Sequence, residues 1–272
     1  MEEKIYLKFL DFIIKIKFQE NIEEKDKKNI NKLKKIWIRI IEKKLGQLIT
    51  YENNKKNVVF EINFVFQYQA QIFTFKKKFF NFYFPISKQL NKRKILFYAL
   101  NSSENQFFIL LNQVFYSLIA NIGGLTIHGS AIIDKDNYAY IFLAKNGGGK
   151  STIAKLLSKN SKYQIFCDDV FYLIPKDNHY FVYQSIMEYL KKDLKKNIRG
   201  YFLKKIFFIK KSKKNCISLI KDKNIIINNF YKQVFSGLVN QKLIILNTKK
   251  FLEINEKNFF ILKFNLKIKN LI

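Results

Sequence analysis

Three consecutive glycines, Gly147 to Gly149, constrain this chain more than any other feature of its sequence. The chain has nine glycines in 272 residues, and six of them fall between positions 123 and 149. Glycine adopts backbone conformations that a side chain forbids, and it lets another group approach the backbone closely. In the segment AKNGGGKST, residues 144 to 152, we therefore expect an unusual backbone conformation or the close approach of another group to the backbone.

The flanks of this segment predict a strand before it and a helix after it. Residues 138 to 144 form an apolar run of strand length, and residues 151 to 158 place Ile153, Leu156 and Leu157 on one helical face. A strand, a glycine-rich turn and a helix that begins at Lys-Ser make up the phosphate-binding P-loop pattern. Backbone amides of such a loop converge on phosphate oxygens, and the helix N-terminus adds a positive dipole. The pattern predicts nucleotide binding together with Mg²⁺.

Each position of the loop then has an expected role. Lys150 would reach the terminal phosphates, and the Ser151 hydroxyl would hold Mg²⁺. The full pattern has glycine six residues before the lysine, and this chain has Ala144 there. The predicted nucleotide-binding residues are Ala144, Lys145, Asn146, Gly147, Gly148, Gly149, Lys150, Ser151 and Thr152.

Polar residues before and after the loop indicate which class of P-loop protein the chain resembles. His128 lies in LTIHGSAII, and Asp168 and Asp169 follow the apolar run YQIFC. The order GGLTIHGSAII, YIFLAKNGGGKSTIAKLL, YQIFCDDV resembles the ATP-binding domain of HPr kinase/phosphorylase and its relatives. ATP-dependent phosphoenolpyruvate carboxykinase shares this type of core. The resemblance covers about residues 105 to 220.

The resemblance implies an α/β (α+β) nucleotide-binding domain over residues 101–272 and an ATP-Mg-dependent kinase. Such an enzyme transfers the γ-phosphoryl group to a hydroxyl of a protein, a peptide or a small molecule. By resemblance, Lys150 acts on the transferred group and Asp169 is the general base. Ser151 and Asp168 are magnesium ligands, and His128 is an accessory catalytic residue. Adjacent side chains on a strand leave on opposite faces, which predicts different duties for the two aspartates.

The chain also departs from the family. Thr152 stands where HPr kinases carry an acidic residue, and their Arg-Gly-Leu-Gly segment has no counterpart beyond Arg199-Gly200. These departures do not support HPr as the substrate, and whether the chain has phosphorylase activity stays open. Residues 202 to 220, FLKKIFFIKKSKKNCISLI, resemble the strand hairpin of HPr-kinase-related proteins found near peptide-modification genes. A non-catalytic ATP-binding module in a peptide-modification or regulatory system is thus the alternative.

Residues 1–100 are predicted to form a β-rich region of unknown role. Apolar side chains alternate with polar ones over residues 12 to 18 and 60 to 68, which is the period of a half-buried strand. A further strand over residues 79 to 84 is stopped by Pro85, and the charged segment from residue 20 to 35 is too polar for a core. We expect these strands to be antiparallel and to act as a scaffold or cap, because they carry no catalytic cluster.

Residues 103 to 137, between this region and the glycine loop, contain further local patterns. Ser103 and Gln106 make a capping box, and Gly123 and Gly124 are expected to end the helix that follows. One apolar run, residues 125 to 133, then reaches a turn over residues 134 to 137.

The net charge of +29 raises a third alternative, a basic nucleic-acid-binding protein. Residues 191 to 214 hold eleven Lys or Arg against one acidic residue. However, the segment has no recognisable readout motif, and Lys, Asn, Ile and Phe are enriched together, as in AT-rich coding sequences. We therefore do not expect nucleic acid as a partner.

The remaining features concern location and partners. Cys167 and Cys216 lie far apart without metal-binding spacing, which favours a reducing cytoplasm. The N-terminal MEEKIYLKFLDF does not have the pattern of a signal peptide, and the apolar stretch from residue 107 to 127 is interrupted by Asn, Gln and Ser. We expect no membrane span; a homo-oligomer and the identity of the phosphate acceptor stay open.

Overall fold

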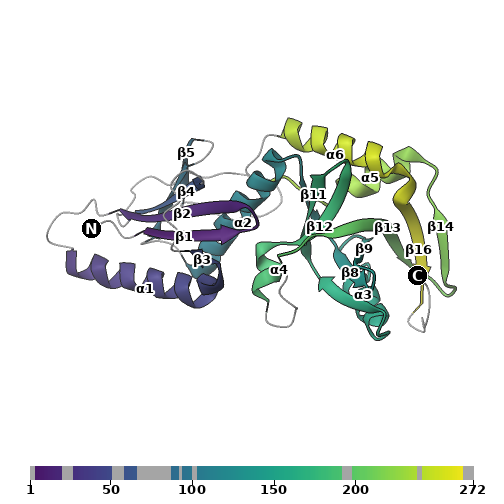
Figure 1. Cartoon of the computed structure of the whole chain (residues 1–272), viewed down its shortest axis with the longest axis horizontal. Coiled ribbons are helices and arrows are strands. Elements are labelled where there is room, and N and C mark those ends of the chain that lie inside the picture. The colour runs from purple at the N-terminus through teal and green to yellow at the C-terminus, as the bar shows by residue number, and fades with distance from the viewer. Residues whose placement is uncertain are drawn as a thin grey trace. The chain divides into compact units, whose positions relative to one another are not determined.

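The computed structural model describes residues 4–19, 27–50, 58–65, 87–91, 94–99, 103–191, 198–237 and 241–265. The chain is a mixed α/β protein, in agreement with the predicted α+β class (Figure 1). It forms two compact units, Met1–Leu111 and Asn112–Ile272. The division falls inside helix α2, Glu104–Asn121.

The first unit contains a six-stranded sheet in the order β3-β1-β2-β4-β6-β5. Its elements are β1 Lys4–Phe9, β2 Phe12–Gln19, α1 Lys27–Leu45, the 3-10 turn Gly46–Leu48, β3 Ile49–Thr50, β4 Val58–Val65, β5 Ser87–Asn91 and β6 Lys94–Tyr98. Strands β2, β4 and β6 run parallel to one another, so the expectation of antiparallel strands was wrong for the centre of this sheet. Parallel neighbours need a crossover connection, and α1 lies in the connection between β2 and β4.

Helix α1 also corrects the interpretation of the charged segment. The described part of that segment is the start of α1, in which Ile30 is buried, and the same helix goes on to bury Trp37 and Ile41. The Trp37 ring packs edge-on against Phe64, Phe97 and Phe107, with centroids 5.4, 5.4 and 5.9 Å away. The unit therefore has its own aromatic core. The strand predicted over residues 79 to 84 lies outside the described residues.

The second unit is built on a ten-stranded sheet. Its main path runs β10-β8-β9-β13-β12-β11-β7-β15, and β16 pairs with both β13 and β14. The strands are β7 Leu125–His128, β8 Ser130–Asp134, β9 Tyr138–Leu143, β10 Tyr163–Cys167, β11 Val170–Lys176, β12 His179–Gln184, β13 Tyr201–Lys211, β14 Cys216–Leu219, β15 Val234–Phe235 and β16 Phe259–Phe264. The helices are α3 Lys150–Ser158, α4 Ile186–Leu190, α5 Lys223–Tyr231 and α6 Gln241–Asn255, with a 3-10 turn at Glu256–Asn258.

Helices cover both faces of the central strands (Figure 1). On β9, Ile141 and Leu143 belong to the apolar cluster that contains Phe230 of α5 and Phe251 of α6. Their neighbour Phe142 belongs to the cluster on the α3 face. Burial on both faces explains why β9 is a continuous apolar run rather than an alternating one.

The predicted single run over residues 125 to 133 is in fact two strands. Strand β7 pairs with β11 and β15, whereas β8 pairs with β9 and β10. Gly129 lies between them, where an added Cβ would stand 2.8 Å from Leu143 Cδ2 and 3.0 Å from the Phe142 carbonyl oxygen. Glycine is required here because the chain passes so close to β9.

The strand hairpin expected over residues 202 to 220 is also corrected. Strands β13 and β14 do not pair with each other, because β16 lies between them. Strand β16 runs parallel to β13 and antiparallel to β14. Two local predictions are confirmed: Ser103 and Gln106 form a reciprocal capping box, and Asn137 N–H donates to the Asp134 carbonyl in the predicted turn.

Candidate functional site

The glycine loop, residues 144–149, connects the end of β9 to the start of α3. Gly147 has φ 73° and Gly149 has φ 99°, both in the left-handed region that side chains disfavour. Gly148 has a different reason to be glycine: an added Cβ would stand 2.6 Å from the Ala144 Cβ and 2.8 Å from the Lys145 carbonyl oxygen. The Gly148 N–H donates to that same carbonyl at 2.9 Å. Each of the three consecutive glycines is thus required, two by conformation and one by space.

Lys150 begins α3 and folds back over the glycine loop. Its Nζ donates to the Ala144 carbonyl oxygen at 2.9 Å, and the residue is buried. Burial lowers the pKa of Lys150, while the negative charges of Asp169 and Asp168 oppose that shift. The first hydrogen bond of the helix runs from Ile153 N–H to the Gly149 carbonyl, so the amides of residues 150 to 152 precede the intrahelical ladder. The loop therefore combines a buried cation with helix N-terminal donors, which together favour an anion.

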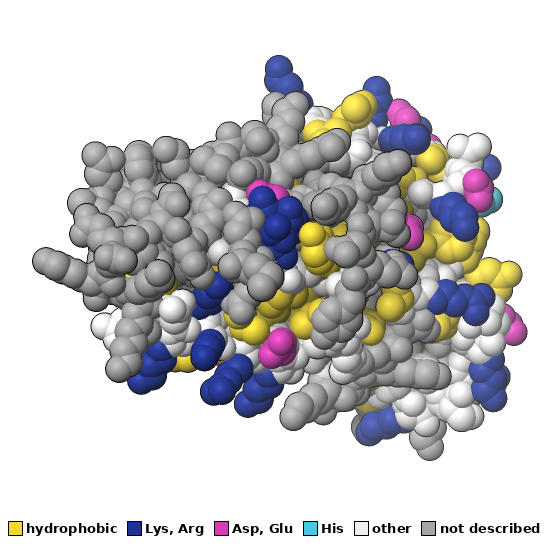
Figure 2. All heavy atoms as spheres, turned by 60° about the vertical axis from the view of Figure 1, so that its left-hand side comes forward, with side chains coloured by type: hydrophobic (Ala, Val, Ile, Leu, Met, Phe, Trp, Pro, Cys, Tyr) yellow, Lys and Arg dark blue, Asp and Glu magenta, His cyan; other side chains and the backbone are white. Residues whose placement is uncertain are grey.

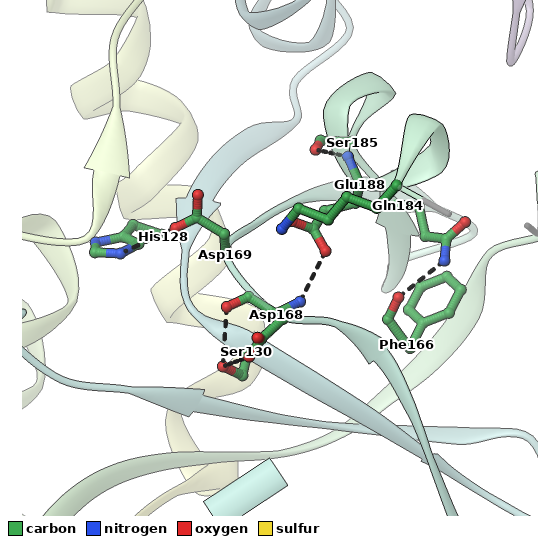
Figure 3. Close-up of polar contacts among 9 residues, drawn as sticks. His128, Ser130, Phe166, Asp168, Asp169, Gln184, Ser185 and Glu188 are labelled. Atoms are coloured by element: carbon green, nitrogen blue, oxygen red, sulfur yellow. Dashed lines mark hydrogen bonds and ion pairs between the residues drawn. The ribbon is translucent and has the colours of Figure 1, made fainter. Parts of the chain in front are cut away.

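His128 and Asp169 form a pair at the ends of neighbouring strands (Figure 3). The His128 Nε2 lies 3.4 Å from Asp169 Oδ1, and the Asp169 side chain is 62% exposed. The backbone fixes this pairing, because Gly129 N–H donates to the Asp169 carbonyl at 2.9 Å and His128 is the register partner of Val170. The hydrogen bond from His128 lowers the pKa of Asp169, and partial burial opposes the shift. Asp169 is consequently an accessible carboxylate that is ionised at neutral pH.

Aromatic rings also lie near His128. The Phe235 ring lies 6.0 Å from the His128 ring and stacks on Tyr116 at 5.6 Å. Burial, with a smaller effect from the charge of Asp169, raises the pKa of Tyr116 to about 12. Tyr116 therefore stays a neutral hydroxyl next to the His–Asp pair.

Asp168 turns to different partners from those of Asp169 (Figure 3). The Ser130 hydroxyl lies 3.3 Å from Asp168 Oδ1 and 3.4 Å from the Asp168 carbonyl oxygen, and it can donate to either. The Asp168 N–H donates to Glu188 Oε2 at 2.9 Å. The two adjacent aspartates thus differ in environment. Their separate roles stay a prediction.

Glu188 is a residue that the sequence reasoning missed. Its side chain is 1% exposed and forms an ion pair with Lys191. Burial raises the pKa of Glu188, although Lys191 and the Asp168 N–H favour its ionised form. The sequence pattern Ser-x-x-Glu over residues 185 to 188 could have marked a helix start here, and Ser185 Oγ accepts from the Glu188 N–H at 3.2 Å as the N-cap of α4.

Gln233 is a second missed residue, and it ties the loop to the His128 strand. Its backbone carbonyl accepts from the His128 N–H at 2.8 Å. With its amide nitrogen turned toward the two carbonyls, the side chain donates to His128 O at 3.3 Å and to Ala144 O at 3.1 Å. Ala144 O thus receives both Gln233 and Lys150. No local sequence pattern marks Gln233, because its partners are distant in the chain.

Other candidate residues have simpler explanations. Cys167 is fully buried, and burial raises its thiol pKa, so it is a small core residue, whereas Cys216 is exposed. His179 begins β12, where its ring packs 5.0 Å from Phe202. In the described part of the chain, no cluster of three or more His, Cys, Asp or Glu side chains could hold a metal ion.

The basic segment 191–214 lies partly outside the described residues, and its described part is mainly β13. Lys204 Nζ lies 4.1 Å from the centre of the Tyr138 ring, and Lys205 Nζ lies 5.3 Å from that of Phe260. On the face in Figure 2, Lys and Arg side chains occur at several separate places, interspersed with other types. Among the described helices, none has the length and hydrophobicity to cross a membrane.

Comparisons with known proteins find a likeness among solved structures alone, and the match described here is weak. No family model and no curated protein matches the chain. Among solved structures, the Hpr(Ser) kinase/phosphatase from Coxiella burnetii matches over 48% of this chain and 98% of that chain. The sequence identity is 11% and the TM-score is 0.28. A likeness of this size is too weak to carry an argument, so the case for a function rests on the residues of the site.

Proposed function

We propose that this chain binds ATP with Mg²⁺ at the glycine loop and transfers the γ-phosphoryl group to a hydroxyl of a protein, peptide or small molecule. The observation that carries the proposal is the loop itself. Two glycines at positive φ and a spatially required third one precede a buried lysine at a helix N-terminus. This combination suits a polyphosphate, because it supplies backbone donors, a helix dipole and a cation at one point.

The proposed metal fits the residues nearby. Magnesium keeps several waters and usually takes only one or two protein carboxylates together with substrate phosphates. A site of this kind needs no cluster of protein ligands, and the described residues have none. Ser151, at the second position of α3, and the Asp168 carboxylate would hold the ion. When bound, Mg²⁺ would neutralise charge on the phosphates.

Asp169 is suited to receive the acceptor hydroxyl. Its carboxylate is accessible, ionised and held by His128. In the transfer, a bond forms between the acceptor oxygen and the γ-phosphorus, and the bond from that phosphorus to the β,γ-bridging oxygen breaks. The hydroxyl proton passes to Asp169, and ADP leaves. Because the transition state is loose, orientation of the hydroxyl is the larger part of this role.

A turnover measurement tests this proposal. The wild type, Asp169→Asn and the control Asp177→Asn, which changes an exposed turn residue, are incubated with γ-labelled ATP and Mg²⁺. Release or transfer of the label should fall about a hundredfold or more in Asp169→Asn, while ATP affinity and the control stay unchanged. Equal turnover by all three proteins would contradict the role of Asp169. Binding of ATP by the wild type without any turnover would identify a non-catalytic ATP-binding module instead.

A further inference from the structure

A cavity of about 530 Å³ lies beside the glycine loop. Its wall is formed by the loop, the C-terminal end of β13 and one side of α5. The volume lies in the range of pockets that enclose small organic ligands. The sequence motifs account for the loop but not for this cavity, which has no assigned ligand.

The lining of the cavity has two chemical characters. Four lysines contribute to it, namely Lys145, Lys210, Lys211 and Lys232, and none of its described lining residues is acidic. Apolar side chains, among them Phe208 and Ile225, form the rest of the wall together with polar residues. An inorganic anion would need only the lysines. A ligand that joins phosphates to a flat apolar ring system would use both parts.

The residues proposed for phosphoryl transfer do not line this cavity. His128, Asp168 and Asp169 are absent from its wall. The cavity is lined by residues of the glycine loop, whereas the two aspartates are close enough to Lys150 for their charges to affect its pKa. A phosphate chain bound on the loop would therefore have a carboxylate side and a lysine side. The acceptor must approach the terminal phosphate at the carboxylates, so the rest of the nucleotide is directed to the lysine side.

Helix α5 supplies groups suited to a nucleobase. Ile225 is 42% exposed and lines the cavity, which gives a base an apolar surface to pack against. Asn229, one turn later, donates its Nδ2 to the Ile225 carbonyl at 2.8 Å. This leaves the Asn229 Oδ1 to accept a hydrogen bond, for example from an amino group of a base.

We infer that this cavity binds the base and ribose of the nucleotide, with its lysines on the α- and β-phosphates. This inference rests on the proposed function, because it places the remainder of the ligand whose phosphates occupy the glycine loop. If the cavity binds the nucleoside, then the nucleoside contributes to the affinity for ATP, and α5 provides the surface that it contacts.

Binding of two ligands to matched variants tests the inference. Mg-ATP and Mg-tripolyphosphate, which lacks the nucleoside, are each titrated calorimetrically into the wild type, Ile225→Ala and Ile227→Ala. Ile227 is the control, because it lies on the same helix and is 47% exposed but does not line this cavity. Neither exposed isoleucine is needed for the core, so both variants are expected to fold.

The wild type should bind ATP more tightly than tripolyphosphate. Ile225→Ala should weaken ATP binding about fivefold through lost apolar contact and leave tripolyphosphate binding unchanged. Ile227→Ala should change neither. Wild-type affinity for ATP in Ile225→Ala would overturn the inference while leaving the glycine loop as a phosphate site. Failure of the wild type to bind either ligand would instead refute the proposed function, and the inference with it.

Discussion

Ala144 and Gly148 are coupled by space: a Cβ on Gly148 would stand 2.6 Å from the Cβ of Ala144. Alanine at the position where a P-loop has glycine is therefore compatible with this backbone only while position 148 has no side chain. The Gly148 N–H···O bond to Lys145 holds the turn in this compact form. The departure at Ala144 and the glycine run are two parts of one packing arrangement.

The first prediction follows from this coupling. Gly148→Ala should lower the free energy of unfolding by about 1–3 kcal/mol, because the new methyl group clashes with Ala144 and with the Lys145 carbonyl. Adding Ala144→Gly should recover part of that loss, since one of the two clashes disappears. A double-mutant cycle by chemical denaturation should give a coupling of about 0.5 kcal/mol or more. Strict additivity of the two changes would show that the loop relaxes in another way.

Ala144→Gly alone should leave nucleotide affinity unchanged or slightly improved. The substitution removes a methyl group and relaxes the backbone, and the carbonyl that receives Lys150 remains. Titration of a fluorescent ATP analogue would measure this. A large loss of affinity would mean that the Ala144 side chain itself shapes the phosphate site.

Asp168→Asn should weaken the magnesium dependence of ATP binding and have little effect on the free energy of unfolding. The amide keeps an oxygen that can accept from Ser130, but the charge proposed to hold the ion is lost. Ser130→Ala is the matched control, because it removes the hydrogen bond and keeps the charge. ATP affinity is measured over a Mg²⁺ titration. If Ser130→Ala and Asp168→Asn shift the Mg²⁺ requirement equally, the carboxylate serves only to hold the strand end.

The His128–Asp169 pair predicts a specific pH effect. The pKa of Asp169 is below its ordinary value of 3.8, mainly because His128 donates to it. The ionised carboxylate therefore stabilises the fold above pH 3.8, and this contribution is lost as the pH falls through the lowered pKa. In His128→Ala the Asp169 pKa should rise toward 3.8, whereas His179→Ala should leave it unchanged. Carboxyl NMR titration measures both; an unchanged Asp169 pKa in His128→Ala would contradict the pairing.

Local patterns in the sequence predicted the elements around the loop, and non-local pairing explains most of what they missed. The capping box at Ser103, the turn after Asp134 and the strand–loop–helix over residues 138 to 158 involve neighbours in the chain. The insertion of β16 between β13 and β14 joins segments about 50 residues apart, as in the pairing of Phe208 with Ile261. No pattern within residues 202 to 220 could show it.

Some residues of the candidate site could likewise be found from local sequence patterns, and others only from the fold. The candidates His128, Lys150 and Asp169 were found from motifs, and the structure brings His128 within 3.4 Å of Asp169 and directs Lys150 to the loop carbonyl. Gln233 was missed because its partners lie about 90 to 105 residues earlier in the chain. Glu188 could have been noticed from the Ser-x-x-Glu pattern at the start of α4, but only the fold shows that it accepts from the Asp168 backbone.

Calorimetric titration of Mg-ATP into the wild type, Lys150→Ala and Lys155→Ala measures whether the glycine loop is the nucleotide site. Both lysines lie on α3, but Lys150 is buried against the glycine loop, whereas Lys155 is exposed. Lys150→Ala should lose at least tenfold in affinity, because the cation at the phosphates is removed, and Lys155→Ala should bind like the wild type. Equal affinity of all three proteins for Mg-ATP would contradict the assignment of the glycine loop as the nucleotide site.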